Sequence, residues 1–562
     1  MTILKQASLL MFPSGYKEDK LYSILPSDGS GDLDFARSSV GTRVNSDGFI
    51  ETMPPNVMLN SQPTSTGGYQ TGVVFQATNI YGWNGVYYGD NSVNRIAYFA
   101  NPNQIVGNTY TFSVFIKMTD GSIPSVGTAA TDDLQLWNNG ANILGLQIVD
   151  MGNGIYRCSN TRSATSTTNN VAVQKAVGNS AKTFEVSGYQ LVLGSIPKPY
   201  YPTTDRLNYP RIDYTGGGCG KLLIEPQRTN TVLSNSDYTQ LWANGNVVIT
   251  QNATISPNGS NDAQKLASAN TFGQHFLRQI LGGHTVGAPH VYSCFAKAAE
   301  LDILSLRLLN GGGQTYTDFD LTNGTHNGGA NGKMIDYGNG WWRCISYHAS
   351  SASAFLYPYI YTVRGNTQGD GVSGLYAYGA MIEEGTVETS LIDTTNAAVT
   401  RTQDVSKTSG LSASINSVEG VLFWEGNLTD NDTVSSFISM SDGTNTVSNS
   451  LNLQLRPSSN SLWWQFIVGN SIQVSKIVTL TDIFAKTKLA FKWEANDFCI
   501  FENGTKISFD TAGITFPAST LNSLYFAAAN AVGSFNTNLK TNALAVYNTA
   551  LSDADLTELT TL

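Results

Sequence analysis

Two long segments of this chain resemble each other, so its fold must be one that can be copied in tandem. VDMGNGIYRCS (149–159) matches IDYGNGWWRCIS (335–346), which aligns Arg157 with Arg343. YTFSVFIK, which ends at residue 117, matches VYSCFAK, which ends at residue 297, and QLVLGSIPKPYYPTTDR matches MIEEGTVETSLIDTTN. A lead-in, GFIETMPPNVMLNS (48–61), recurs as KLLIEPQRTNTVLSNS (221–236). Because the order of the blocks is kept, the sequence indicates a tandem duplication with changes in loop length.

Within each copy, apolar and polar positions alternate with a period of two. Tyr110, Phe112, Val114 and Ile116 occupy alternate positions, and the four aromatic residues of AFLYPYIYTV (354–363) do the same. This alternation predicts strands with one buried face. Pro358 interrupts the second of these segments and predicts an edge strand there. At about 150 residues per copy, such strands favour an all-β fold of tandem sandwiches.

The remaining segments complete a four-part organisation. We expect an N-terminal arm at 1–55, a first sandwich at 56–206, a lead-in plus second sandwich at 207–400, and a third sandwich at 413–562. The arm has too little apolar mass to fold alone, so we expect it to dock onto a partner or onto the first sandwich. In the last segment Asn503-Gly504 predicts a hairpin, and Ser552 predicts the N-cap of a short terminal helix.

Composition and charge exclude several classes of function. The net charge is −10, charged residues make up 13% of the chain, and no dense run of Lys or Arg occurs. Nucleic-acid binding needs clustered cations, so we expect none. No apolar stretch is long enough to span a bilayer, so membrane insertion is not expected either. The number of cysteines is five and no C-x-x-C pair is present, so we expect buried, reduced thiols made in a bacterial cytoplasm.

Two phrases and the N-terminal arm carry a resemblance to a known group of proteins. DFARSSVGTRVNSDGFIE (34–51) and PRIDYTGGGCGKLLIEPQRTN (210–230) resemble a signature of virion proteins from bacteriophages that infect Bacteroidetes, including crAss-like phages. The opening LLMFPSGYKEDKLYSILPSDGSGD resembles the N-terminal arm of those proteins. The two copies resemble jelly rolls of carbohydrate-binding modules, and the last segment is similar to laminin-G and concanavalin-A-like sandwiches. The resemblance implies a head fibre, tail fibre or spike on the virion surface, commonly a homotrimer, which contacts another virion protein through the arm.

Jelly rolls of this type bind glycans through aromatic rings that stack on the apolar faces of sugars, beside amide and carboxylate groups that bond the hydroxyls. Packing in a core or an interface is the other role open to such rings. Trp83 stands in a loop rich in Gly, Asn and Tyr, and Trp137 stands beside two asparagines. The predicted glycan-binding residues are Trp83, Tyr87, Tyr88, Trp137, Trp242 and Trp463.

Other candidate chemistry is weaker. Asp430 and Asp432 are weak candidate ligands for a structural calcium ion, since a solvated loop is the favoured explanation for them, and no other cofactor is expected. Glu425 and Glu494 each stand next to a tryptophan, as in some glucanase sandwiches, but the paired-glutamate motif of those enzymes is absent. The five histidines lie near no nucleophile or zinc-protease motif and are expected in loops or at the surface. Arg157 and Arg343 are expected to brace a loop or pair with a carboxylate.

The leading hypothesis is therefore a virion fibre without enzymatic activity, which binds glycans of the host surface or of mucus multivalently. Two alternatives remain open from the sequence. One is a tailspike depolymerase that cleaves host capsular polysaccharide, and the other is an architectural decoration of the capsid without a ligand.

Overall fold

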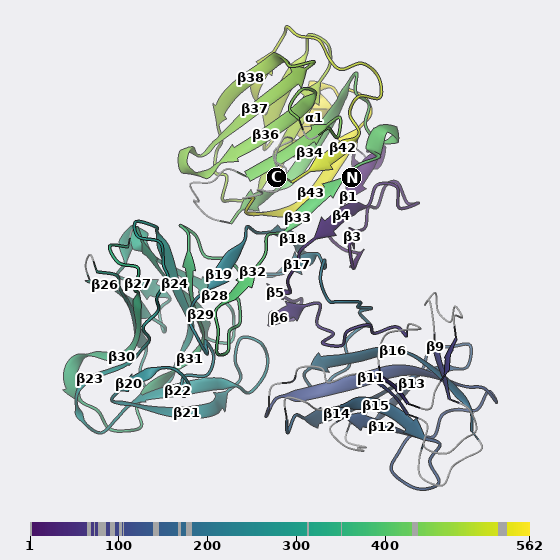
Figure 1. Cartoon of the computed structure of the whole chain (residues 1–562). Helices are drawn as coiled ribbons and strands as arrows, with labels where there is room; N and C mark the ends of the chain where they lie inside the picture. The colour runs from purple at the N-terminus through teal and green to yellow at the C-terminus, as the bar shows by residue number, and fades with distance from the viewer. Residues whose placement is uncertain are drawn as a thin grey trace. The chain divides into compact units, whose positions relative to one another are not determined.

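The computed structural model describes residues 3–63, 69–71, 74–76, 86–89, 96–99, 104, 106–138, 145–166, 170–175, 182–311, 314–349, 351–429, 436–444, 446–526 and 537–562. Nearly all regular structure in this part of the chain is antiparallel β-sheet, as the alternation predicted. The chain divides into two compact units (Figure 1). One contains residues 52–207 and 258–262, and the other contains residues 1–51, 208–257 and 263–562.

The first jelly roll consists of two sheets that enclose one apolar core, to which Phe112 contributes from one sheet and Leu136 from the other. Its larger sheet is, in order, β13 (Gln147–Asp150), β14 (Ile155–Ser163), β11 (Thr109–Met118), β16 (Phe184–Leu193), β9 (Val86–Gly89) and β8 (Val74–Gln76). The opposing sheet is β12 (Leu134–Asn138), β15 (Val171–Lys175), β10 (Ile96–Phe99) and β7 (Tyr69–Thr71).

The second jelly roll has the same plan. One sheet is β21 (Val247–Thr254), β22 (Ala263–Ser268), β31 (Gly374–Glu384), β24 (His290–Ala298), β29 (Trp341–His348) and β28 (Gly332–Asp336). The other is β20 (Ala243–Gly245), β23 (Phe272–Arg278), β30 (Tyr357–Gln368), β25 (Ile303–Leu309), β26 (Gln314–Asp320) and β27 (Thr325–His326). Strand β30 lies between β23 and β25, so the prediction that Pro358 marks an edge strand is wrong. Pro358 is the second residue of its strand, where a missing N–H costs the ladder little.

The duplication is confirmed at the level of single contacts. In both copies a bulge falls between a serine and a phenylalanine of the central strand, opposite a glycine with φ near +60°, Gly188 (63°) or Gly379 (61°). The expectation for the two aligned arginines is also confirmed. The Arg343 guanidinium donates to the Thr389 carbonyl over 2.7 Å and to Ser293 Oγ over 3.1 Å. Arg157 makes the corresponding bonds to the Lys198 carbonyl and to Ser113 Oγ.

The third sandwich incorporates strands from distant parts of the sequence. One sheet is β17 (Arg211–Asp213), β18 (Lys221–Ile224), β43 (Leu539–Tyr547), β34 (Gly420–Leu428), β39 (Thr487–Trp493), β40 (Phe498–Glu502) and β41 (Thr505–Asp510), with β1 (Leu9–Met11) also on β43. The other is β2 (Tyr16–Lys17), β3 (Lys20–Leu21), β4 (Leu33–Ala36), β33 (Val405–Thr408), β42 (Ser523–Tyr525), β35 (Ser436–Ser441), β36 (Ser450–Arg456), β37 (Ser461–Val468) and β38 (Ser471–Thr479). Two further ladders pair β5 (Gly41–Val44) with β6 (Ile50–Met53) and β19 (Arg228–Asn230) with β32 (Val399–Arg401). Short 3-10 helices span Ile3–Gln6, Gly329–Asn331, Leu411–Ala413 and Pro457–Ser459.

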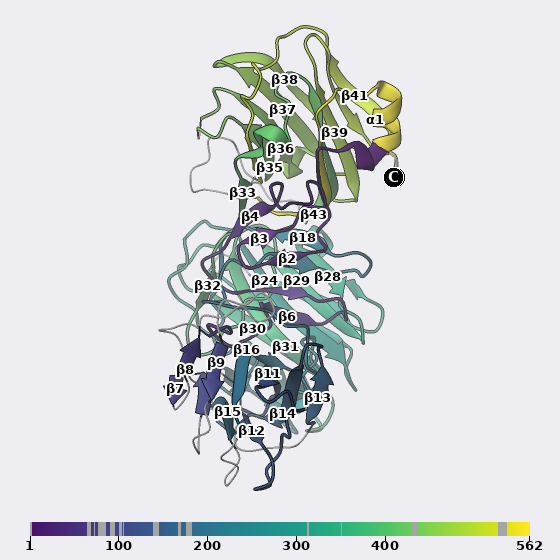
Figure 2. The ribbon, with the colours of Figure 1, turned by 90° about the vertical axis from the view of Figure 1, so that its right-hand side faces the viewer.

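The N-terminal arm belongs to this third sandwich, so the prediction that it docks onto the first sandwich is wrong, while its contact with a partner stays a prediction. Leu9 pairs with Val546, and Leu9, Met11 and Phe35 are buried in the core of the third sandwich. Figure 2 shows the arm running beside helix α1 (Asp553–Thr560). The sequence indicates that the arm cannot fold alone. The strand with which it pairs lies more than 500 residues away in the sequence, so no local pattern identifies that strand.

Two local predictions are confirmed, and a third is confirmed in part. Asn503 and Gly504 adopt φ of 48° and 85° in the turn between β40 and β41, and Ser552 caps α1 by accepting from the Asp555 amide. All five cysteines are free, and four are buried, but Cys219 is exposed, contrary to expectation. Within the described residues, no helix has both the length and the apolar character needed to cross a membrane.

Candidate functional site

The second jelly roll presents an outward sheet face rich in tyrosine and arginine. On β30, Ile360 points into the core while Tyr359 and Tyr361 point to the other side of the sheet, because alternate residues of a strand face opposite ways. The register places Phe276 opposite Tyr361 and Arg307 opposite Tyr359. The arginine–tyrosine face comprises Phe276, Arg278, Ser305, Arg307, Tyr316, Asp318, Tyr357, Tyr359, Tyr361 and Arg364.

The rings of this face contact one another. Tyr359 and Tyr361 stack with their ring centres 5.5 Å apart, and the Phe276 ring lies 5.2 Å and 5.4 Å from theirs. Tyr316 lies 5.8 Å from Tyr361. Tyr359 and Tyr361 are covered by these neighbours, whereas Phe276 and Tyr316 are half-exposed and available to a ligand. Burial raises the pKa of Tyr361 to about 12, so its phenol keeps its proton and donates or accepts as a neutral group.

Three guanidinium groups lie against these rings. The Arg307 guanidinium is 4.8 Å from the centre of the Tyr359 ring and 5.1 Å from that of Tyr316, and it donates to the Tyr361 hydroxyl over 3.3 Å. Arg278 lies 5.8 Å from the Tyr359 ring. Arg364 lies 4.9 Å from Tyr316 and pairs with Asp318 at 3.3 Å, the one carboxylate of the face. The face therefore carries an excess of positive charge in a chain whose net charge is −10.

Two of the predicted tryptophans lie half-buried on outward faces of other sheets. Trp137 projects from β12 on the side away from the core residues Leu134 and Leu136. Trp463 lies on β37 in the third sandwich, where Arg456 stacks at 4.7 Å from its ring and its indole N–H donates to Ser475 Oγ over 3.0 Å. Both placements leave ring surface open to a ligand.

The other predicted residues either lie outside the described part of the chain or are partly or fully buried. Trp83, Asp430 and Asp432 lie outside the described residues, as does the side chain of Tyr87. Tyr88 is half-buried on β9, opposite Glu185. The prediction for Trp242 is wrong, because its ring is 8% exposed, packs edge-on against Tyr238 at 5.3 Å in the core, and donates to the Ser234 carbonyl. A sugar cannot stack on a ring buried in this way.

Glu425 and Glu494, the candidate residues for glycoside hydrolysis, do not form a catalytic pair. Glu425 lies opposite Lys488 in the ladder between β34 and β39, whereas Glu494 follows Trp493, which lies opposite Gly420. The two are therefore six residues apart along the strands, about 20 Å, and a glycosidase needs its two carboxyl groups within about 10 Å. Glu425 instead pairs with Lys486 at 2.8 Å.

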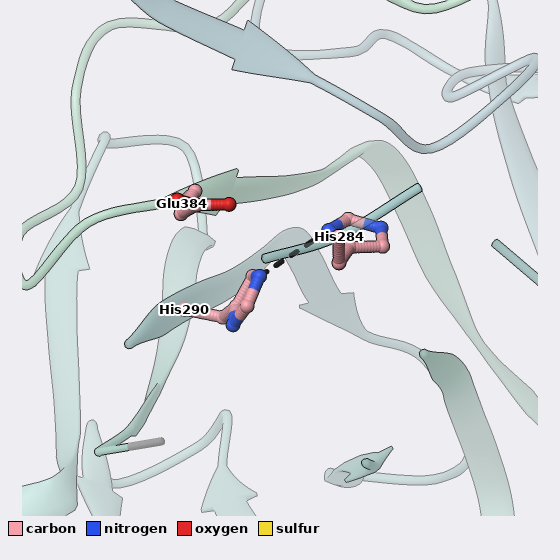
Figure 3. A group of neighbouring side chains, drawn as sticks. All are labelled: His284, His290 and Glu384. Atoms are coloured by element: carbon pink, nitrogen blue, oxygen red, sulfur yellow. Dashed lines mark hydrogen bonds between the residues drawn. The ribbon is translucent and has the colours of Figure 1, made fainter. Parts of the chain in front are cut away.

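One group among the described residues offers ligands for a metal ion. His284, His290 and Glu384 each direct one nitrogen or oxygen into a common space, and these atoms lie within 4.8 Å of one another (Figure 3). The expectation of loop or surface histidines is wrong for His275, His290 and His348, which are buried on strands, whereas His284 lies in a loop as expected but is buried there. His290 precedes the core residues Tyr292 and Cys294 by two and four positions, so strand alternation predicts that its side chain faces inward. The residues that surround it could not be inferred without the strand register.

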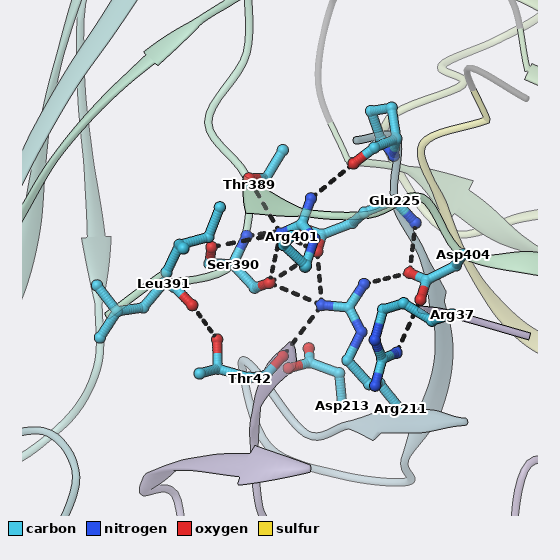
Figure 4. A network of polar contacts seen from close by, with 12 residues as sticks. Arg37, Thr42, Arg211, Asp213, Glu225, Thr389, Ser390, Leu391, Arg401 and Asp404 are labelled. Carbon is cyan, nitrogen blue, oxygen red and sulfur yellow. Dashed lines mark hydrogen bonds and ion pairs between the residues drawn. The ribbon is translucent and has the colours of Figure 1, made fainter. Parts of the chain in front are cut away.

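A polar pocket of about 240 Å³ lies where β5, β17, β18, β28 and β43 meet. Its lining charges pair with one another: Lys540 with Asp213 at 2.7 Å and Lys333 with Glu388 at 2.8 Å. Residues of its wall continue into a buried network that joins the arm, the lead-in and the connector after the second jelly roll (Figure 4). The members of that network are Arg37, Arg211, Glu225, Arg401 and Asp404. Since these charges satisfy one another, we infer a structural role for the network.

No protein-family model matches this chain, and neither does any curated protein. Solved structures resemble it weakly. The CBM40 of the Ruminococcus gnavus IT-sialidase, bound to α2,3-sialyllactose, is 15% identical with a TM-score of 0.23, over 26% of this chain and 83% of that chain. The CBM22-1–CBM22-2 tandem domain of Xyn10C from Paenibacillus barcinonensis is 11% identical with a TM-score of 0.20, over 62% and 99%. The sialidase of Trypanosoma rangeli is 10% identical with a TM-score of 0.21, over 93% and 97%.

Proposed function

We propose that this protein binds acidic glycans and that the arginine–tyrosine face is its main binding surface. The observation that carries the proposal is the meeting of three guanidinium groups with a cluster of rings on one outward sheet face, where Tyr316 and Phe276 are half-exposed. Rings take up the apolar faces of sugars, and guanidinium groups bind carboxylates or sulfates through parallel N–H···O bonds. A face with this composition favours uronic, sialic or sulfated sugars over neutral ones.

The geometry keeps the cost of binding low. Arg307 is held between Tyr316 and Tyr359 before any ligand arrives, so little side-chain entropy is lost on association. Arg278 and Arg364 lie at the margins of the face, where they are half-exposed and exposed, so they are the guanidinium groups that an anionic sugar can reach. Trp137 and Trp463 lie on other sheets and provide further ring surfaces, so one chain can bind an extended or repeated glycan at several points.

We also propose that the protein is a fibre on the surface of a bacteriophage particle, assembled as a homotrimer, and that it binds its glycans without cleaving them. The resemblance of the lead-ins and of the arm to phage virion proteins supports this placement. Because Leu9, Met11 and Phe35 of the arm are buried in the third sandwich, contact with another virion protein must use the arm's exposed residues, such as Ile24 and Val40, or another surface.

The glycan proposal is tested by binding to an array that contains neutral, sialylated, uronic and sulfated glycans. We expect the wild-type protein to select acidic glycans and the double variant R278Q/R364Q to lose at least about tenfold in affinity, about 1.4 kcal/mol. R162Q, which removes a half-exposed arginine from β14 of the first jelly roll, is the matched control and should bind like the wild type. Equal binding by the double variant, or selection of neutral glycans alone, contradicts the proposal.

Placement and chemistry need separate tests. Virions labelled with an antibody against this protein should show it at projecting fibres, and its absence from purified particles contradicts the fibre. Purified protein incubated with host capsular polysaccharide should release no reducing sugar, and steady release would show a depolymerase.

A further inference from the structure

Three side chains with metal-binding groups meet at one end of the second jelly roll. His290 is the first residue of β24 and faces inward, in phase with the core residues Tyr292 and Cys294. The register places it opposite Glu384, the last residue of β31. His284 comes from the segment 279–289, which connects β23 of one sheet to β24 of the other. The group thus joins a sheet edge to the loop that crosses between the two layers.

The distances suit a small cation. His290 Nε2 lies 3.2 Å from His284 Nδ1, and Figure 3 shows the Glu384 carboxylate directed toward the two rings. Two ligands of a tetrahedral zinc ion, each about 2.0–2.1 Å from the metal, are about 3.3 Å apart. The nitrogens therefore already have the spacing of neighbouring zinc ligands, and the third donor lies within 4.8 Å.

Both histidines are positioned to act as metal ligands. His284 and His290 are 7% and 1% exposed, so both rings are held among their neighbours. An imidazole binds a metal ion through the lone pair of a ring nitrogen. The groups that face His290 are His284, Glu384 and, across β29, His348, whose Nε2 lies 3.2 Å from Ser346 Oγ. Glu384 is exposed, so an ion could enter from solvent.

We propose that His284, His290 and Glu384 form a binding site for Zn²⁺ or a closely related divalent transition metal. Two imidazoles and one carboxylate are a donor set that zinc takes up readily, whereas Ca²⁺ and Mg²⁺ require oxygen ligands. With three protein ligands, a fourth position stays open to water or to an external ligand. The bound ion fastens the 279–289 loop to β24 and β31, independently of the arginine–tyrosine face on the opposing sheet.

A direct hydrogen bond between two neutral imidazoles is the competing explanation for this arrangement, and the two explanations differ in their response to metal. Full-length protein is first treated with a chelator and then titrated with Zn²⁺ and, separately, with Co²⁺, Ca²⁺ and Mg²⁺. We expect one Zn²⁺ per chain by calorimetry, a rise in the thermal midpoint, and visible absorption bands of four- or five-coordinate Co²⁺. Neither Ca²⁺ nor Mg²⁺ should compete.

Variants distinguish this site from others on the chain. E384Q changes an exposed residue, keeps its shape, and should weaken Zn²⁺ binding at least tenfold. H284Q should abolish the stoichiometric binding, while H326Q, in the half-exposed histidine of β27, should bind like the wild type. Circular dichroism of each variant checks that it is folded. The proposal is overturned if the wild-type protein takes up no stoichiometric Zn²⁺, or if E384Q and H284Q bind it as tightly as the wild type.

Discussion

Replacing Asp404 by asparagine should loosen β4 of the N-terminal arm and β17 of the lead-in, which Asp404 joins to the connector. The carboxylate of Asp404 is fully buried and accepts hydrogen bonds from Arg37 Nη1 over 2.8 Å and from the Glu225 amide over 2.9 Å, and it also pairs with Arg211. Arg37 belongs to the arm, Arg211 to the lead-in, and Asp404 to the connector after the second jelly roll. One carboxylate thus holds together three segments that are distant in the sequence.

The free-energy cost of this substitution follows from the buried charges that lose a partner. Three buried guanidinium groups, those of Arg37, Arg211 and Arg401, share the two carboxylates of Asp404 and Glu225. An amide in place of Asp404 leaves Glu225 as the one anion of the network. Breaking a buried ion pair from one side costs about 3–5 kcal/mol, because the partner stays buried without compensation. D34N removes an exposed pair with Lys20 on the same arm and should cost less than about 1 kcal/mol.

Hydrogen exchange measured by mass spectrometry is the suitable assay, because a chain of several sandwiches does not unfold in one step. In D404N the amides of β4 and β17 should exchange at least about a hundredfold faster than in the wild type, if about 3 kcal/mol of local stability is lost. Peptides from the first jelly roll, which belongs to the other compact unit, should be unaffected. If β4 exchanges no faster in D404N than in D34N, the network does not hold the arm and the reasoning fails.

Two further predictions concern pH and the duplicated framework. Although burial opposes it, Arg401 and Arg211 hold the pKa of Glu225 well below its ordinary value. Its contribution to stability is therefore complete above about pH 4.5 and is lost as the pH falls further. Calorimetry should show the thermal midpoint of the larger unit falling as the pH drops from about 4.5 to about 2.5, and a constant or rising midpoint would refute this. In N230A, two carbonyls and two amides lose their side-chain partner, because Asn230 Nδ2 donates to Ala380 and Ile392 and its Oδ1 accepts from Val232 and Ile382. The loss should be about 2–4 kcal/mol by thermal or chemical denaturation, and less than about 0.5 kcal/mol would show that water replaces these bonds.

The sequence predicted those features that depend on local alternation or on copying. The strands, the Asn503-Gly504 turn and the bracing arginines follow from patterns within a few residues or between aligned copies. Pairing between distant segments leaves no such trace. Leu9 and Val546 are both apolar, but nothing near either residue indicates that they pair.

The same difference between local patterns and contacts of distant segments applies to the candidate sites. Strand alternation correctly placed Tyr357, Tyr359 and Tyr361 on one face, but the arginines beside them come from other strands and could be assigned only with the register. Trp242 was misassigned because the sequence alone does not distinguish a ring in a loop from a ring that returns to the core. The metal-binding group was missed for a related reason, since His290 and Glu384 are 94 residues apart and meet only through the ladder of β24 and β31.

The copied lead-in gives a physical reason why the second jelly roll and the third sandwich share one compact unit. In both copies an arginine of the first strand pairs with a glutamate that follows it across a hairpin, Arg43 with Glu51 at 2.9 Å and Arg211 with Glu225 at 2.6 Å. The second hairpin also adds β18 to the edge of β43, so the strand that leads into the jelly roll is part of the sandwich's own sheet. The first hairpin packs on the second, where Arg43 donates to the Ile212 carbonyl. The lead-in of the second jelly roll is therefore held by main-chain hydrogen bonds to the third sandwich, which accounts for their membership of one compact unit.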